Sequence, residues 1–164
     1  MLKGVISVMP GYAGGPSTGS GQAPSYDEVC SGATGHAEVI KIEFDPKQIA
    51  YTDLLTVFFA THDPTTKDRQ GNDVGTQYRS IILYTNQSKK KAAEKFISEL
   101  NGSRPEPLKI ITEIKPLDRF YPAENYHRDY YAKNPLNSYC QVVINPKLAK
   151  VKEKFADLLK TKSA

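Results

Sequence analysis

The chain has 164 residues, a net charge of +4 and 39% hydrophobic residues. This size and composition suit one compact domain with a packed core, which we expect to span residues 1–164. No apolar run approaches the roughly 18 residues that span a bilayer, and the N-terminus lacks the features of a signal peptide, so we expect a cytoplasmic protein without membrane contact. The lysines lie along helical faces without alternating aromatic residues, which argues against nucleic-acid binding.

The predicted elements alternate between strands and helices. An apolar stretch at 4–9 predicts a short buried strand, and the Gly-, Ser- and Pro-rich residues 10–24 predict a surface loop. Residues 37–44 alternate apolar and polar side chains as a strand does. Apolar residues at spacings of three and four predict a helix over 51–62, with Thr52 as its N-cap.

The second half of the chain continues this pattern. A strand is predicted at 79–85, and a helix begins at Ser88 and ends near Gly102. The remaining predictions are a strand at 110–115, a helix at 122–133, a short strand or extended arm at 141–144, and a last helix opened by Asn145 and Pro146. This order indicates an α/β (α+β) fold, namely a ferredoxin-like sandwich whose mixed or antiparallel sheet carries packed helices.

The segment QGNDVGTQYRS at 70–80 stands out because it is polar yet lies between a predicted helix and a predicted strand. It presents the carboxyl group of Asp73 and the phenol of Tyr78. Loops held by a rigid scaffold often carry binding and catalytic residues. The alternative is an ordinary connection, in which Asp and Asn side chains satisfy the geometry of turns.

Four segments resemble the peptide methionine sulfoxide reductase A family, in the family's order. They are GYAGG at 11–15, YDEVCSGATGHAEVI at 26–40, HDPTTKDRQGNDVGTQYRS at 62–80 and FYPAENYHRDYYAKNP at 120–135. The resemblance covers nearly the whole chain. It implies reduction of the S-epimer of methionine sulfoxide, protein-bound or free, to methionine, as a repair of oxidative damage. It also implies thioredoxin as the reductant, and no cofactor.

The resemblance implies four catalytic residues. Glu28 in YDEVC matches the family's acid, which burial keeps protonated until it donates to the sulfoxide oxygen. Tyr12 and Tyr78 match two phenols that hydrogen-bond this oxygen, and Asp73 matches a carboxylate that helps to set the protonation of the site through water. Structural alternatives remain: Ser25 and Glu28 also fit a helix capping box, the two tyrosines fit amphipathic packing, and Asp73 fits a turn.

The cysteines depart from the family pattern. The family's Gly-Cys-Phe-Trp segment, which carries the nucleophilic cysteine, has no counterpart, because neither Cys30 nor Cys140 has this context. Cys30 is most simply a small buried side chain. Cys140 lies where many family members place the resolving cysteine, which makes it a candidate resolving thiol, with structural burial as the alternative.

The resemblance therefore implies a chain without the family's first strand and helix, less stable than a complete relative and with exposed apolar surface. Such a chain is truncated or inactive. The alternative functions are a non-catalytic remnant or a weak binding module for sulfoxide-containing peptides.

A metal site is not predicted. His36, His62, His127 and the cysteines match no compact zinc-binding spacing. We expect His36 and His127 to hydrogen-bond near the pocket, and His62 to cap the C-terminus of its helix, where a cation is favoured.

Overall fold

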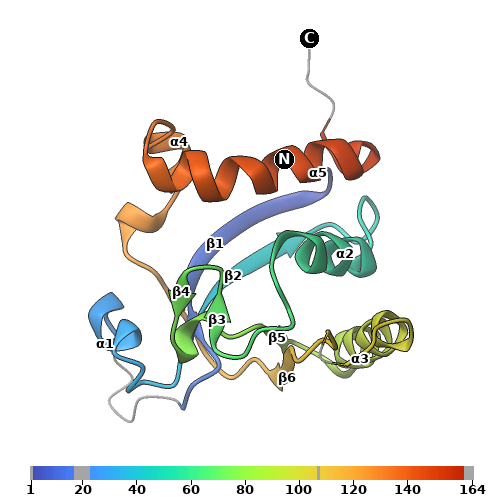
Figure 1. The fold of residues 1–164 in the computed structure, drawn as a ribbon, viewed down its shortest axis with the longest axis horizontal. Coiled ribbons are helices and arrows are strands. Elements are labelled where there is room, and N and C mark those ends of the chain that lie inside the picture. Colours follow the sequence, from blue (N-terminus) through green and yellow to red (C-terminus); the bar gives the residue numbers. More distant parts are fainter. Residues whose placement is uncertain (1, 17–22, 107, 161–164) are drawn as a thin grey trace.

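The computed structural model describes residues 2–16, 23–106 and 108–160, and its strands form three sheets (Figure 1). The largest sheet is antiparallel, with the order β2-β1-β7, and the other two are an antiparallel pair, β3-β4, and a parallel pair, β5-β6. The strands are β1 (Val5–Ala13), β2 (Ala37–Phe44), β3 (Arg69–Gln70), β4 (Asp73–Val74), β5 (Ile81–Tyr84), β6 (Glu113–Pro116) and β7 (Phe120–Pro122).

Five α-helices are described, and short helical turns separate several of them. The α-helices are α1 (Tyr26–Cys30), α2 (Tyr51–Thr61), α3 (Gln87–Gly102), α4 (Tyr130–Lys133) and α5 (Asn145–Lys154). The turns are η1 (Thr76–Tyr78), η2 (Asn125–His127), η3 (Cys140–Ile144) and η4 (Ala156–Leu158). No helix among the described residues combines the length and apolar character needed to cross a membrane.

The α+β class is confirmed, but the described strands do not join into the one sheet of a ferredoxin-like sandwich. The strands of the segment between α2 and β5 pair with neither of the other two sheets. It folds back on itself as the β3–β4 hairpin, around a two-residue turn at 71–72, and then enters η1. A two-residue loop is the commonest connection of such hairpins.

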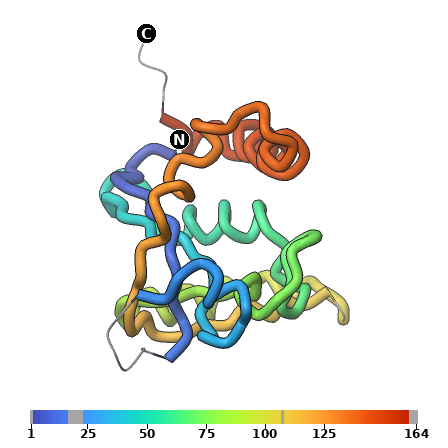
Figure 2. Tube along the Cα trace, turned by 90° about the vertical axis from the view of Figure 1, so that its left-hand side faces the viewer, coloured from blue at the N-terminus to red at the C-terminus, as the bar shows by residue number. Residues whose placement is uncertain are grey.

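The main apolar core lies between α2, α3 and the parallel pair β5-β6. Leu55 of α2, Ile82 of β5 and Ala93 of α3 are buried at its centre. Aromatic side chains extend it, with the rings of Phe59 and Phe96 stacked at a centroid distance of 5.7 Å. In Figures 1 and 2, α2 lies between α5 above and α3 below. The predicted apolar faces of α2 and α3 are therefore the faces that build the core.

A second, smaller apolar cluster joins α1 to β1 and β7. It contains Tyr12, Val29, Tyr121 and Ala123, with Tyr26 packed against it. β7 approaches β1 closely at Gly11, and this approach makes the cluster possible. A Cβ at Gly11 would collide with the backbone of β7. The glycine is thus required by packing between the two strands.

One face of the β1–β2 pair carries exposed aliphatic side chains, as the resemblance implies. Ile6, Val8 and Ile40 are 72%, 55% and 59% exposed. The strand expected at 4–9 is confirmed as part of β1, but the expectation that it is buried is wrong. β1 also continues to Ala13, because β2 pairs with it along its length and extends it beyond the apolar run.

The predicted helix caps need correction. α2 begins after Ala50, whose amide donates to the carboxylate of Asp53 at 3.1 Å, so Thr52 is not the cap. α3 begins after Asn86, whose side chain accepts from the amide of Lys89 at 2.9 Å. An amide oxygen at the N-cap satisfies a free N–H of the first turn.

The continuous helix predicted at 122–133 is wrong. Its start belongs to β7, which pairs with β1, and its middle is interrupted at Asp129, which adopts the left-handed conformation with φ of 54°. The segment predicted at 141–144 as a strand or arm is a helical turn that leads directly into α5. The first error arises in part because pairing with β1, rather than local pattern, makes 120–122 a strand.

Candidate active site

Two carboxyl groups and two phenols gather where β2, the β3–β4 hairpin, η1 and α1 meet. We call Tyr26, Glu38, Asp73 and Tyr78 the carboxyl–phenol cluster. Partial burial and the charge of Asp73 raise the pKa of Glu38. Burial and the neighbouring Glu38, Cys30 and Asp73 raise the pKa of Tyr78. These mutual effects show that side chains far apart in sequence face one another here.

Glu38 occupies the second position of β2, directly opposite Tyr12 of β1. Directly paired residues of antiparallel strands share one face of the sheet. The side chain is exposed to solvent, but its surroundings raise its pKa, so that it retains a proton more readily than an ordinary carboxyl group. Glu38 is thus a carboxyl group of the cluster that can act as a proton donor.

Tyr26 opens α1 and turns its phenol toward the same cluster. Its pKa is raised by a hydrogen bond with the thiol of Cys30, by burial, and by Tyr78 and Glu38. A phenol with a raised pKa stays protonated and remains a hydrogen-bond donor. The two tyrosines of the cluster therefore offer two O–H groups beside a proton-retaining carboxyl group.

The structure corrects the prediction for Glu28. Its carboxylate accepts hydrogen bonds from the amide and hydroxyl of Ser25, at 2.7 and 2.8 Å, in the capping box of α1. It is exposed, and its pKa is lowered by these bonds. In this structure Glu28 is neither buried nor held protonated, and it serves the capping box. Its catalytic role stays a prediction. Sequence reasoning missed Glu38, which lies in the same 26–40 segment. Its pairing with Tyr12 could have signalled it only if the register of β1 and β2 were known.

The hydroxyl of Tyr12 makes a hydrogen bond that competes with its predicted role of holding the sulfoxide oxygen. Its side chain is only 2% exposed, and its hydroxyl donates to the carboxylate of Glu124 at 2.7 Å. Burial and then Glu124 raise its pKa. Glu124 also accepts from the amide of Tyr26 at 2.9 Å. Tyr12 thus fixes α1 and β7 to the sheet beside the cluster.

Asp73 and Tyr78 both reach the cluster, as their loop position predicted. Asp73 lies on β4 and Tyr78 ends η1, so the hairpin and the turn deliver one carboxyl group and one phenol to Glu38. The buried side chain of Gln77 between them donates to the carbonyl of Cys30 at 3.2 Å. This bond ties η1 to the end of α1.

The two cysteines are free and differ in exposure. Cys30 is half-buried beside Tyr26, whereas Cys140 is fully buried in η3. The phenol of Tyr139 connects Cys140 to the cluster electrostatically, because burial, Asp73, Glu38 and Cys140 all raise its pKa. Cys30 is predicted from the sequence as a small buried side chain, and the structure buries it only in part.

The three histidines make hydrogen bonds or ion pairs rather than a metal site. His36 accepts from the amide of Gly15 at 3.1 Å, and burial lowers its pKa. His127 lies 3.9 Å from the carboxylate of Glu124. His62 meets the carbonyl of Phe58 at 2.6 Å at its helix end, but burial lowers its pKa and disfavours the predicted cation. Within the described ranges, no three His, Cys, Asp or Glu residues are grouped to hold a metal ion.

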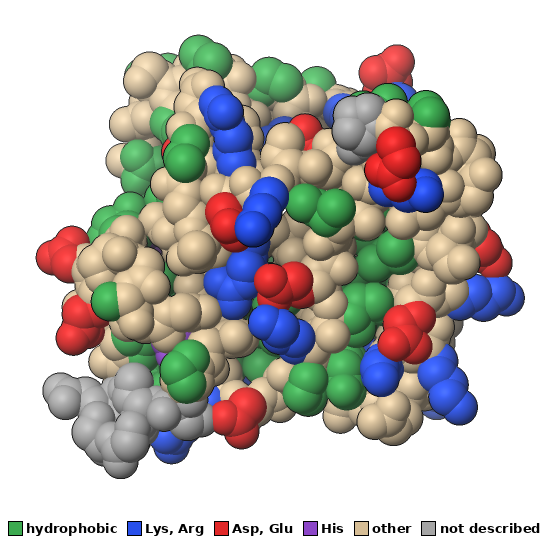
Figure 3. All heavy atoms as spheres, turned by 60° about the horizontal axis from the view of Figure 1, so that its bottom comes forward, with side chains coloured by type: hydrophobic (Ala, Val, Ile, Leu, Met, Phe, Trp, Pro, Cys, Tyr) green, Lys and Arg blue, Asp and Glu red, His purple; other side chains and the backbone are tan. Residues whose placement is uncertain are grey.

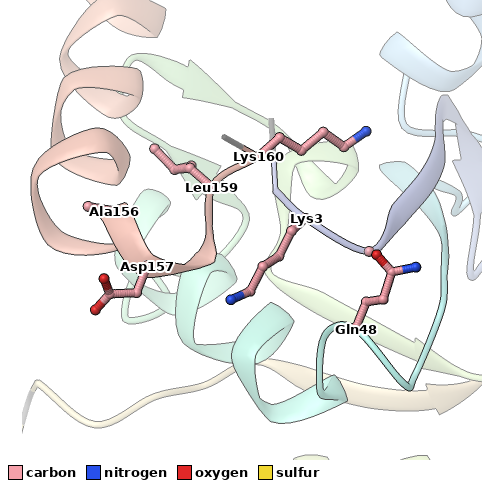
Figure 4. Close-up of a pocket in the computed structure, with 7 residues that line it drawn as sticks. Lys3, Gln48, Ala156, Asp157, Leu159 and Lys160 are labelled. Carbon is pink, nitrogen blue, oxygen red and sulfur yellow. The ribbon is translucent and has the colours of Figure 1, made fainter. Parts of the chain in front are cut away.

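Shallow cavities lie among the described residues, and two of them are considered for the site. One, of about 480 Å³, adjoins the cluster and is lined by residues 30–33 and 74–77. The other, of about 620 Å³, is lined by Lys3, Gln48, Asp157 and Lys160 among others (Figure 4). Lys3 precedes β1 and Tyr12 is near its end, so about 30 Å of extended strand separates this second cavity from the cluster. Only the first cavity can serve the same site.

The charges on the surface do not form a continuous basic stripe on the face drawn in Figure 3, where Lys and Arg side chains are interspersed with Asp and Glu. A basic stripe is the electrostatic footprint of nucleic-acid binding. The chemistry of the site is therefore better sought in the carboxyl–phenol cluster.

An α+β scaffold that places a proton-retaining carboxyl group beside two phenols defines a class of site that can hold and protonate a polar oxygen. Comparison identifies the protein class: residues 1–159 match the peptide methionine sulfoxide reductase family. The chain belongs to this family.

Relatives with known names match the sequence of this chain over almost its whole length. Peptide methionine sulfoxide reductase MsrA of Acinetobacter baumannii (strain AYE) is 53% identical over 159 residues, which are 97% of this chain and 88% of the relative. The MsrA of Saccharolobus solfataricus is 51% identical over 159 residues, 97% of this chain and 86% of the relative.

Solved structures show the same fold. Mxr1 from Saccharomyces cerevisiae in reduced form aligns with a TM-score of 0.76 and 38% identity, over 84% of this chain and 76% of that one. Methionine sulfoxide reductase A of Corynebacterium diphtheriae aligns with a TM-score of 0.71 and 34% identity, over 82% of this chain and 66% of that one.

Proposed function

We propose that this chain binds the sulfoxide group of methionine sulfoxide at the carboxyl–phenol cluster. It reduces the S-epimer, in proteins or as the free amino acid, with thioredoxin as the reductant. The observation that carries the proposal is that η1, which ends at Tyr78, is tied to α1 by the bond from Gln77 to the carbonyl of Cys30, beside the cavity lined by residues 30–33 and 74–77. The raised pKa of Glu38 supports it. Family membership supplies the reaction class.

In this proposal each member of the cluster has one task. The hydroxyls of Tyr26 and Tyr78 donate hydrogen bonds to the sulfoxide oxygen, and Glu38 gives it a proton. Asp73 keeps the pKa of Glu38 high enough for that donation, which agrees with its effect on Glu38. These assignments replace Glu28 with Glu38 and Tyr12 with Tyr26.

The electron balance requires thiols. A thiol attacks the sulfoxide sulfur and takes over its oxygen, which leaves methionine and a sulfenic acid. A second thiol then forms a disulfide and releases water, and the thioredoxin dithiol reduces that disulfide. Of the two thiols in the chain, Cys30 adjoins the phenols, so an attack from within this chain falls to Cys30. Cys140 is the candidate for the resolving step.

A second function, sulfoxide binding without reduction, is favoured by the state of the thiols. Cys140 is fully buried, and Cys30 is half-buried. A chain of this kind would recognise methionine sulfoxide in a peptide and release it unchanged.

One experiment separates these functions. Binding of a peptide with S-methionine sulfoxide is measured by calorimetry, and methionine formation is measured with dithiothreitol and with reduced thioredoxin. Glu38→Gln is the test variant, and Glu28→Gln is the matched control, since both exchange one carboxyl group for an amide. Binding with turnover, abolished only by Glu38→Gln, supports reduction. Binding without turnover leaves the second function, and absence of binding refutes both.

A further inference from the structure

Arg79 directly follows Tyr78 of the cluster, and its side chain points inward. It is 10% exposed, which is unusual for an arginine. Its guanidinium donates to the carbonyl of Thr76 at 2.8 Å, to that of Gly14 at 3.3 Å and to that of Gly35 at 3.0 Å. Its Nε lies 3.5 Å from a carboxylate oxygen of Glu113 on β6. One side chain thus contacts four separate segments.

Three of these segments lead to the proposed site. Thr76 begins η1, the turn that ends at Tyr78. Gly14 immediately follows β1, and Gly35 lies three positions before Glu38. The guanidinium therefore connects the turn that carries a phenol with the strand ends that carry the proton donor.

The backbone around Arg79 is shaped to receive it. Gly14 has φ of +84°, and a Cβ at this position would lie 3.4 Å from Nη2 of Arg79 and 3.0 Å from Ile81. A side chain at Gly14 would be strained by its backbone and would crowd the guanidinium. The planar fork of arginine can serve several carbonyls at once, which a lysine ammonium cannot match in geometry.

We propose that Arg79 is a positioning residue that holds η1, and with it the phenol of Tyr78, against the end of β1 and the segment before β2, and thereby sets the affinity for the sulfoxide group. This inference rests on the proposed function for its ligand. It assigns to Arg79 no contact with the substrate. Its charge is balanced locally by Glu113, so its role is to hold η1 against the strand ends.

The test uses the full chain with Arg79→Lys and Arg79→Ala. Arg104→Ala is the matched control, because Arg104 makes one long hydrogen bond, at 3.4 Å to the carbonyl of Leu108. The first readout needs no ligand: the phenol of Tyr78 is titrated by NMR with ring-labelled tyrosine, assigned with Tyr78→Phe. The second readout is the dissociation constant for the S-methionine sulfoxide peptide.

We expect both Arg79 variants to move the titration of Tyr78 toward the ordinary tyrosine value of about 10. We also expect them to weaken peptide binding by roughly tenfold or more, since bonds from a charged donor are lost. Millimolar guanidinium ion should restore both readouts in Arg79→Ala, and Arg104→Ala should leave both unchanged.

Two results would overturn the proposal. The first is an unchanged Tyr78 titration in a folded Arg79→Lys protein, and the second is a loss of thermal stability in both variants without any change in binding or titration. If the wild-type chain does not bind the peptide, the proposed function fails. The titration of Tyr78 and its rescue by guanidinium still decide whether Arg79 positions the turn.

Discussion

The hydroxyl of Tyr12 donates to the carboxylate of Glu124 at 2.7 Å, across 112 positions of sequence. The same carboxylate accepts the amide of Tyr26 at the start of α1. Glu124 therefore joins β1, α1 and the segment after β7 at one point. This contact explains how a short helix such as α1 is held beside the site.

Tyr12→Phe removes this hydrogen bond and keeps the ring in place. We expect the free energy of unfolding to fall by about 1–2 kcal/mol, because the partner is charged but partly solvated. Urea denaturation measures the change. Peptide binding should weaken less than in Tyr78→Phe. Equal losses in the two variants would mean that Tyr12 holds the sulfoxide oxygen after all.

Tyr78→Phe should weaken binding of the S-methionine sulfoxide peptide by roughly tenfold, because a donor to the oxygen is lost. Calorimetry measures the dissociation constant. Tyr84→Phe is the matched control, since Tyr84 lies on β5 outside the carboxyl–phenol cluster. A binding constant that Tyr78→Phe leaves unchanged would remove Tyr78 from the site.

Glu38 should make stability depend on pH. Its pKa is raised by burial and by Asp73, so the stability it contributes is present below its unfolded pKa of about 4.3 and is lost as pH rises through the folded pKa. Glu38→Gln should therefore raise the melting temperature at pH 7, and the difference should shrink at pH 4. Thermal unfolding at the two pH values measures it.

Glu28→Gln should change the melting temperature at pH 7 in the opposite direction. Its hydrogen bonds from Ser25 lower the pKa, so its contribution is present at neutral pH and is lost as pH falls through the folded pKa. The Glu28→Gln chain should melt below the wild type at pH 7 and approach it in acid. The same sign for both variants would contradict the assignment of the two carboxyl groups.

The two thiols should react at different rates. Cys30 is half-buried and Cys140 is fully buried, so one equivalent of a chromogenic disulfide reagent should react quickly with the folded chain, and the second only in denaturant. Cys30→Ser should abolish the fast phase. Equal reaction of both thiols in the folded chain would show that η3 opens freely.

The sequence predicted the elements with a strong local pattern. The strand at 37–44 is confirmed, as is a helix that runs from Tyr51 to Thr61. The polar segment at 70–80 forms a hairpin and a helical turn that carry Asp73 and Tyr78, and their catalytic roles stay predictions. Local hydrophobic period decides such elements, because burial of one face stabilises them.

The remaining errors arise where pairing between distant segments decides the structure. The chain at 120–122 becomes a strand because β1 accepts it as a partner, which no local pattern reveals. The position of Glu38 depends on the same kind of information, because cross-strand pairing places it opposite Tyr12. The contact of Glu28 with Ser25 is local, and the capping-box pattern indicated it.

The division of the apolar interior into two clusters has a consequence for local opening. The cluster under the site is separate from the one that α2 and α3 share. One partly buried hydrophobic residue packs against the first cluster and six pack against the second. Cooperative units with less buried apolar area open at lower free energy. Amide hydrogens of α1 and β7 should therefore exchange with deuterium sooner than those of α2 and α3, so that the ligand would meet the most adaptable part of the molecule.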